Sequence, residues 1–150
     1  MLERCAPAHL ALTTLCSLWL QGPNHFVWSF PAGGVDAARH ASLEATAAAE
    51  LSEECALRPT SPLIRLLPDG HPGLLETKWS RNRYTPFLAI DPAPDATPGT
   101  RDPEEAHMSV HRVPLSRLEG ELLYGEDVLP PATVTAQLAL RELRRRGLIT

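Results

Sequence analysis

Cysteine is scarce in this sequence. The three cysteines, Cys5, Cys16 and Cys55, are odd in number and widely spaced, and no two of them form a CxxC pair. Such a set is typical neither of the disulfide framework of a secreted domain nor of a zinc site with thiolate ligands. We therefore expect a protein of a reducing compartment, and the cytoplasm is the first expectation.

Long apolar runs are also lacking. The stretch from His9 to Leu20 is mostly apolar, but it is shorter than the ~20 residues that a membrane-spanning helix needs. A secretory signal is disfavoured as well, because Glu3 stands in the n-region and no clean small-residue cleavage site follows Leu20. We expect a strand here and no membrane partner, while an organellar transit role for the first residues stays open.

Charge of one sign is not in excess. The chain has 14 Lys and Arg against 18 Asp and Glu, which gives a formal net charge of -4. This balance leaves no electrostatic footprint for nucleic acid, and a hydrophobic fraction of 43% is ordinary for a globular protein. Residues 1–150, without internal repeats, suit a single domain that can bury its own core.

An amphipathic helix is expected from Leu43 to Ala56. Ser42 is a suitable N-cap, because its hydroxyl can accept a hydrogen bond from the first turn of the helix. Apolar residues then recur every four positions along one face, at Leu43, Ala47, Leu51 and Cys55. Prolines at positions 59 and 62 prevent the helix from continuing.

The other elements follow from short apolar runs and turn residues. Strands are expected at Leu10–Leu20, Phe26–Phe30, Leu63–Leu67, Tyr84–Ile90 and Met108–Val113. Prolines recur between Asp91 and Pro103, so this segment is expected to be a loop, and long loops are often functional. A last helix is expected from Pro131 to Arg146, before Gly147.

Three glutamates near the end of the first helix share one face. Glu50, Glu53 and Glu54 are three and four residues apart, so their carboxylates lie within one turn of each other. Alone, this pattern is more typical of a solvated charged face. The turn at Gly33 favours a metal site instead, because a glycine has no side chain to keep a backbone carbonyl away from a metal ion. Oxygen ligands of this kind favour Mg²⁺ or Mn²⁺ over zinc.

These residues resemble a known family motif. The run from Phe30 to Leu57, FPAGGVDAARHASLEATAAAELSEECAL, is similar to the Nudix box GX5EX7REUXEEXGU, in which U is aliphatic. The matching positions are Gly33, Glu50, Leu51, Glu53, Glu54 and Leu57. The resemblance implies a pyrophosphohydrolase that holds a divalent metal against a diphosphate.

The sequence also departs from the box. Ala49 stands in place of the box arginine, Ala56 in place of the late glycine, and the early glutamate is missing, with Arg39 near its position. Two extra residues, most simply His40-Ala41, lengthen the loop before the helix. In the family the arginine is thought to orient a catalytic glutamate, so its loss is expected to loosen the positioning of the metal ligands more than their ability to bind.

Downstream segments narrow the resemblance to the ADP-ribose and ADP-sugar diphosphatase branch. They are Pro72–Glu76, Tyr84–Ile90, Glu104-Glu105 before Val113-Pro114, and Leu129–Pro131. The resemblance covers about residues 25 to 148 and implies an α/β fold, a Nudix-type α/β/α sandwich with a mixed β-sheet. Fewer residues precede the matched segment than in that branch, whose additional N-terminal strands contribute to a homodimer. A homodimer is one expectation here, with an N-terminus that is truncated relative to the family and lacks part of that surface.

The resemblance also implies roles for individual residues. The expected catalytic residues are Glu53, Glu54 and Glu105, and the expected metal ligands are Gly33, Glu50, Glu53 and Glu54. The expected substrate-binding residues are Glu76, Trp79, Arg81 and Arg83. For the loop acids and the basic residues, ordinary solvated surface is the alternative.

The implied reaction is Mg²⁺-dependent hydrolysis of ADP-ribose or an ADP-sugar to AMP and a sugar phosphate. Its partner would be a nucleoside diphosphate-linked small molecule. A catalytically silent module that binds a nucleotide or a protein is the alternative from another class. A pyrophosphatase acting on coenzyme A or on dinucleoside polyphosphates is a third interpretation, although the additional motifs associated with the former are absent.

Overall fold

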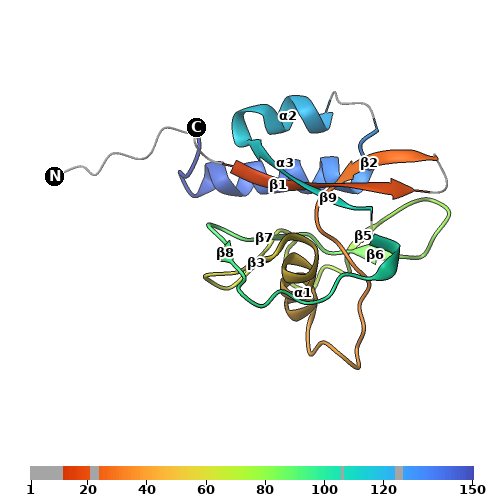
Figure 1. Ribbon diagram of the computed structural model, residues 1–150. Coiled ribbons are helices and arrows are strands. Elements are labelled where there is room, and N and C mark those ends of the chain that lie inside the picture. The colour runs from red at the N-terminus through yellow and green to blue at the C-terminus, as the bar shows by residue number, and fades with distance from the viewer. Residues whose placement is uncertain (1–11, 21–23, 106, 124–126) are drawn as a thin grey trace. The chain divides into compact units, whose positions relative to one another are not determined.

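The computed structural model describes residues 12–20, 24–105, 107–123 and 127–150. Figure 1 follows the chain from strand β1 to helix α3. The chain divides into two compact units, which we call the terminal unit (residues 1–30 and 109–150) and the central unit (residues 31–108). Within the described residues, no helix is long and apolar enough to span a bilayer. A single domain stays a prediction.

The terminal unit contains a three-stranded antiparallel sheet. Its strands are β1 (Leu12–Leu20), β2 (His25–Ser29) and β9 (Ser109–Pro114), in the order β2-β1-β9. A parallel bridge joins Trp28 to Val128, so both strand senses occur around β2. The three strands that the apolar runs predict in these regions are confirmed, apart from residues 10 and 11, which lie outside the described part of the chain.

Two helices cover this sheet. They are α2 (Leu115–Leu123), which contacts β1 and β9, and α3 (Pro130–Arg145), which contacts β2. The core between the elements is built on Leu118, Ala136 and Leu140, with Trp28, Phe30, Val113, Leu115, Val128 and Ile149 packed against it. The helix expected near Pro131 is confirmed. Helix α2 was not predicted; Gly120, a residue of low helix propensity, lies inside it.

Helix α1 (Leu43–Cys55) is the main element of the central unit. Its N-cap is Ser42, whose Oγ accepts a hydrogen bond of 3.2 Å from the backbone N–H of Ala45. The helix ends at Ala56, which adopts the left-handed conformation with φ of 52°. The expected helix and its N-cap are confirmed. Residues 31–42, all of them described, precede it without forming a helix or strand, as the lengthened loop predicts.

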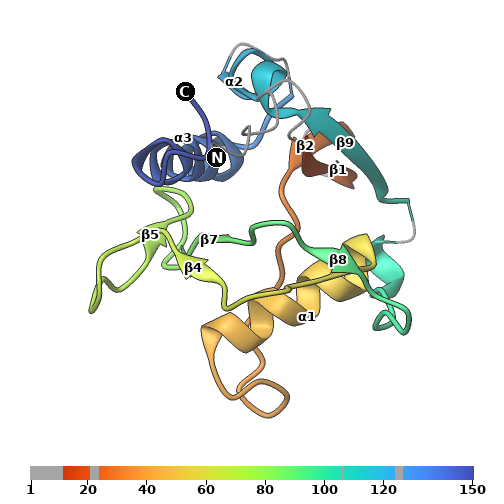
Figure 2. The ribbon, with the colours of Figure 1, turned by 90° about the vertical axis from the view of Figure 1, so that its left-hand side faces the viewer.

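Short antiparallel pairs complete the central unit (Figure 2). The pairs are β3 (Leu57–Arg58) with β8 (Ala93–Pro94), β4 (Ile64–Arg65) with β7 (Phe87–Leu88), and β5 (Leu74–Leu75) with β6 (Arg83–Tyr84). The strand expected at Tyr84–Ile90 is divided between β6 and β7, because Pro86 between them has no N–H to donate. The loop expected after Asp91 contains β8.

Candidate functional site

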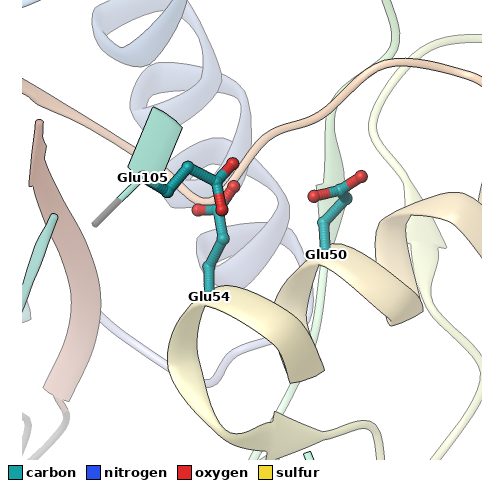
Figure 3. Close-up of side chains that lie close together, drawn as sticks. All are labelled: Glu50, Glu54 and Glu105. Atoms are coloured by element: carbon teal, nitrogen blue, oxygen red, sulfur yellow. The ribbon is translucent and has the colours of Figure 1, made fainter. Parts of the chain in front are cut away.

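Three carboxylates meet in the central unit. Glu50 and Glu54 come from α1, and Glu105 comes from the short 3-10 helix η2 (Pro103–Glu105). One ligand oxygen from each residue lies within 4.8 Å of the others. Figure 3 shows the carboxylates of Glu54 and Glu105 close together. The carboxylate of Glu50 lies beside them, on the same helix as Glu54. We call these three residues the carboxylate cluster.

Glu54 is the most deeply placed member of the cluster. Its exposed fraction is 1%, which is unusual for a glutamate, since an ionised carboxylate is costly to bury without a compensating partner. The backbone N–H of Ala32 donates a hydrogen bond of 3.3 Å to Oε1 of Glu54. The turn that precedes α1 therefore helps to fix this carboxylate in place.

The pKa of Glu50 is raised by burial and by the carboxylates around it. Burial is the largest cause that raises the pKa of Glu50 above its ordinary value. The neighbouring carboxylates raise this pKa further, in the order Glu53, Glu105 and Asp102, whereas Arg39 lowers it. The ionised form of Glu50 is thus disfavoured where these acids gather. A divalent cation would offset that repulsion, and oxygen donors of this type are those that Mg²⁺ and Mn²⁺ prefer.

Gly33 lies directly against Glu50. A β-carbon built at position 33 would overlap the carboxyl group of Glu50, whereas one built at Gly34 would meet nothing within 4 Å. Only glycine lets the backbone approach the carboxylate this closely. The two residues are therefore brought together as the sequence motif predicts, and a role for Gly33 as a metal ligand stays a prediction.

Glu53 points to a different set of partners. Its Oε1 lies 3.2 Å from Nη2 of Arg39 in an ion pair. A β-carbon at Gly99 would overlap the side chain of Glu53, so the proline-rich loop packs closely on it. Glu53 does not join the carboxylate cluster, and its predicted metal and catalytic roles stay predictions.

The four expected substrate-binding residues lie on the hairpin formed by β5, β6 and the turn between them. Trp79 is 86% exposed, and Nζ of Lys78 lies 4.3 Å from the centre of its ring. Arg83 donates from Nη1 to the carbonyl oxygen of Gly73 at 2.7 Å, and the N–H of Glu76 donates to the carbonyl of Asn82. Both interactions hold the hairpin together.

This hairpin lies apart from the carboxylate cluster within the central unit. Figure 2 places β5 on one side of the view and the C-terminal end of α1 on the other. The hairpin that carries Glu76, Trp79, Arg81 and Arg83 is thus separated in this view from the end of α1. Their substrate-binding role stays a prediction that rests on the sequence resemblance.

The proline-rich loop is fastened to α1 through Ser52. Its Oγ donates a hydrogen bond of 2.7 Å to Oδ2 of Asp95 and accepts one of 3.2 Å from the N–H of Gly99. The N–H of Thr97 donates to Oδ1 of Asp95. The hydrogen bond from Ser52, and then that from Thr97, lower the pKa of Asp95. The loop that carries Glu105 is thus held on the helix through the partly buried carboxylate of Asp95.

Arg101 is a residue of this site that the sequence did not reveal. Its guanidinium donates from Nη2 to the carbonyl oxygen of Glu54 and from Nη1 to that of Met108. The signal available in the sequence was an arginine four positions before Glu105 in a proline-rich loop. Nothing in that spacing indicates that the side chain turns back to the helix.

Comparison with known proteins supports the fold. No family model matches the sequence, and no curated protein matches it. Among solved structures, the chain is similar to a crystal structure of an ADP compounds hydrolase, with a TM-score of 0.66 and 24% sequence identity. The match covers 91% of this chain and 68% of that one. At this identity the likeness shows the fold alone, and the expected α/β Nudix-type fold is confirmed.

Proposed function

We propose that this chain is a divalent-metal-dependent hydrolase that acts on a diphosphate linkage. The observation that carries the proposal is the meeting of Glu50, Glu54 and Glu105 within 4.8 Å, with Glu54 buried. Carboxylates on a solvated helix face can point into water, apart from other carboxylates. Their convergence from a helix and a distant loop supports a site that holds a cation.

The donor set fits Mg²⁺ and also Mn²⁺. When bound, such an ion neutralises charge on a diphosphate and activates water. Glu50, Glu54 and Glu105 would hold the ion, and the backbone at Gly33 is a further candidate ligand. The N–H of Ala32, which donates to Oε1 of Glu54 at 3.3 Å, keeps that carboxylate oriented. The site is therefore partly organised by backbone that precedes the helix.

Glu53 and Glu105 are the candidates for moving a proton. Hydrolysis adds the oxygen of water to one phosphorus and breaks its bond to the bridging oxygen, so the proton of water must pass to a base. Glu53 engages Arg39 through Oε1 in an ion pair, and it enters this proposal through the sequence resemblance. Glu105 comes from a loop and is the second candidate base.

For the substrate we propose a nucleoside diphosphate linked to a sugar-like moiety, such as ADP-ribose or an ADP-sugar, which yields AMP and a sugar phosphate. Two observations support it: the downstream segments resemble the diphosphatase branch, and the solved structure with a similar fold is that of an ADP compounds hydrolase. Glu76, Trp79, Arg81 and Arg83 enter this proposal through the sequence resemblance, as does a homodimer.

The proposal is tested with purified protein, Mg²⁺ or Mn²⁺, and a panel that contains ADP-ribose and ADP-glucose. We expect AMP to be released in a metal-dependent way, and we expect Glu54→Gln and Glu105→Gln to reduce the rate. Glu44→Gln is the matched control, because Glu44 is an exposed acid in the first turn of the same helix. No AMP release with any member of the panel would overturn the proposed activity.

A binding module without turnover is the second candidate. It is favoured by Ala49, which leaves the position of the box arginine without a charge, and by the ion pair of Glu53 with Arg39. Calorimetry with ADP-ribose separates the two functions, because tight binding without AMP release is expected only for the module. In that case Ala49→Arg is expected to raise the rate of AMP release.

A further inference from the structure

One guanidinium joins the end of α1 to the loop that carries Glu105. Arg101 donates from Nη2 to the carbonyl oxygen of Glu54, and from Nη1 to the carbonyl oxygen of Met108 at 3.2 Å. Glu54 belongs to the last turn of α1, and Met108 lies just beyond η2. Arg101 therefore spans the two segments that contribute Glu54 and Glu105 to the carboxylate cluster.

The end of α1 provides a physical reason for this contact. The last carbonyl groups of a helix have no partner within it, and the helix dipole makes this end negative. The last turn of α1, which is fully described, holds no basic residue. The guanidinium of Arg101 supplies both a donor and a positive charge at this place. Its fork can reach two carbonyl oxygens at once, which an ammonium group on a single stem does less well.

Backbone hydrogen bonds link Glu105 to the residues that Arg101 adjoins and contacts. The N–H of Glu105 donates a hydrogen bond of 2.9 Å to the carbonyl of Asp102, and the N–H of Met108 donates one of 2.9 Å to the carbonyl of Glu105. Asp102 follows Arg101 in the chain, and Met108 accepts from its guanidinium. The turn that carries Glu105 thus begins next to Arg101 in the chain, and its far end, at Met108, is bonded to the guanidinium of Arg101.

We infer that Arg101 is a positioning residue of the carboxylate cluster: it holds the turn of Glu105 on the end of α1, and thereby sets the distance of Glu105 from Glu50 and Glu54. The inference rests on the proposed metal-dependent function. It assigns to an arginine of the loop the task of orienting a carboxylate for the metal. Arg101 acts through Glu105, and its guanidinium donates to the backbone carbonyls of Glu54 and Met108.

Metal affinity measures this role without depending on any substrate. Mn²⁺ binding is followed by the loss of the electron paramagnetic resonance signal of free Mn²⁺, for the unmodified protein and for Arg101→Gln. Substitution of a partner that orients a metal ligand typically costs about 10- to 100-fold in metal affinity, and we expect a loss in that range. Arg144→Gln is the matched control, because Arg144 is exposed on α3, and it is expected to keep the unmodified affinity.

A double-substitution cycle separates positioning from general damage to the fold. If Arg101 acts through Glu105, Arg101→Gln adds little further loss to a protein that already carries Glu105→Gln. Losses that multiply in the double variant overturn the inference. So does an unchanged Mn²⁺ affinity of Arg101→Gln when the unmodified protein binds Mn²⁺.

A second variant keeps the inference testable where Arg101→Gln does not fold. Arg101→Lys keeps the charge but loses the fork, so we expect an Mn²⁺ affinity between those of the unmodified protein and Glu105→Gln. An affinity equal to that of the unmodified protein overturns the inference. Failure of the unmodified protein to bind Mn²⁺ is a different result, because it overturns the proposed function itself, and the inference falls with it.

Discussion

Gly33 lies so close to Glu50 that a β-carbon at position 33 would overlap the carboxyl group. The contact joins the turn before α1 to the middle of the helix, and Gly34 next to it has open space around its own missing β-carbon. The position of Glu50 is thus limited by backbone on one side. Because the overlapping atoms end a flexible side chain, a larger residue at position 33 is expected to displace the carboxylate more than the backbone.

Gly33→Ala is therefore expected to weaken metal binding while leaving stability almost unchanged. The added methyl group displaces the carboxylate of Glu50, and loss of a properly placed ligand is expected to reduce Mn²⁺ affinity by about 10-fold or more. Titration with Mn²⁺ measures the affinity, and urea unfolding in EDTA measures the stability. Gly34→Ala is the matched control and is expected to bind as the unmodified protein does. Equal affinities for both variants would contradict the prediction.

Ala56→Gly is expected to stabilise the protein. Ala56 ends α1 with φ of 52°, a left-handed conformation that costs a residue with a β-carbon roughly 1–2 kcal/mol. Glycine adopts it without that cost, although it loses more conformational freedom on folding, so we expect a net gain of about 1 kcal/mol in the free energy of unfolding. Urea unfolding of the two proteins measures it.

Ala49→Gly, in the same helix, is expected to lower the free energy of unfolding. Ala49 lies inside α1, where glycine costs roughly 0.5–1 kcal/mol relative to alanine. The two alanine-to-glycine variants should therefore change the free energy of unfolding in opposite directions. A loss of stability in both would show that the left-handed conformation at position 56 carries little strain.

The sequence predicted the part of the site that lies on one helix. Glu50 and Glu54 share a face because of helical geometry, and the N-cap at Ser42 fixes where that helix begins. The turn at Gly33 could also be located, because its motif adjoins the helix in the chain. For these residues, local spacing determines spatial proximity.

The contributions of the loop could not be predicted in the same way. Arg101 reaches Glu54 across 47 positions of sequence, and the ion pair of Arg39 with Glu53 depends on the path of the turn before α1. Such contacts depend on tertiary packing, which no local periodicity encodes. The short strand β8 escaped prediction for the same reason, because it pairs with β3 through only two residues and includes Pro94.

Ser52→Ala is expected to raise the pKa of Asp95 toward its ordinary value. The hydrogen bond from Ser52 is the largest cause that lowers this pKa, and the one from the N–H of Thr97 comes second. A lowered pKa in the folded state means that the ionised form stabilises the docked loop above the ordinary value of about 3.9. This contribution is lost as the pH falls through the pKa of the folded state.

Carbon-detected NMR titration of the carboxyl group of Asp95 measures this change directly. The matched control is Ser80→Ala, because the Oγ of Ser80 accepts from the N–H of Asn82 in the β5–β6 hairpin. It is expected to leave the titration of Asp95 unchanged. A pKa of Asp95 that is the same with and without Ser52 would contradict the assigned cause.

Glu50→Gln is expected to stabilise the metal-free protein at neutral pH. The pKa of Glu50 is raised, first by burial and then by the surrounding carboxylates, so its ionised form is disfavoured in the folded state. A group with a raised folded pKa contributes stability below its unfolded value and loses that contribution as the pH rises through the folded value. At neutral pH the ionised Glu50 therefore destabilises the fold, and a neutral amide removes this effect.

In the presence of metal, Glu50→Gln is expected to be less stable than the unmodified protein. Binding of Mg²⁺ to the folded state raises the midpoint of thermal unfolding, and the increase grows with affinity. The unmodified protein should therefore gain more from Mg²⁺ than Glu50→Gln does, whereas Glu44→Gln should gain as much as the unmodified protein. Thermal unfolding in EDTA and in excess Mg²⁺ gives both comparisons. If Glu50→Gln is less stable than the unmodified protein in EDTA at neutral pH, then the carboxylate has a stabilising partner that outweighs the repulsion from Glu53, Glu105 and Asp102.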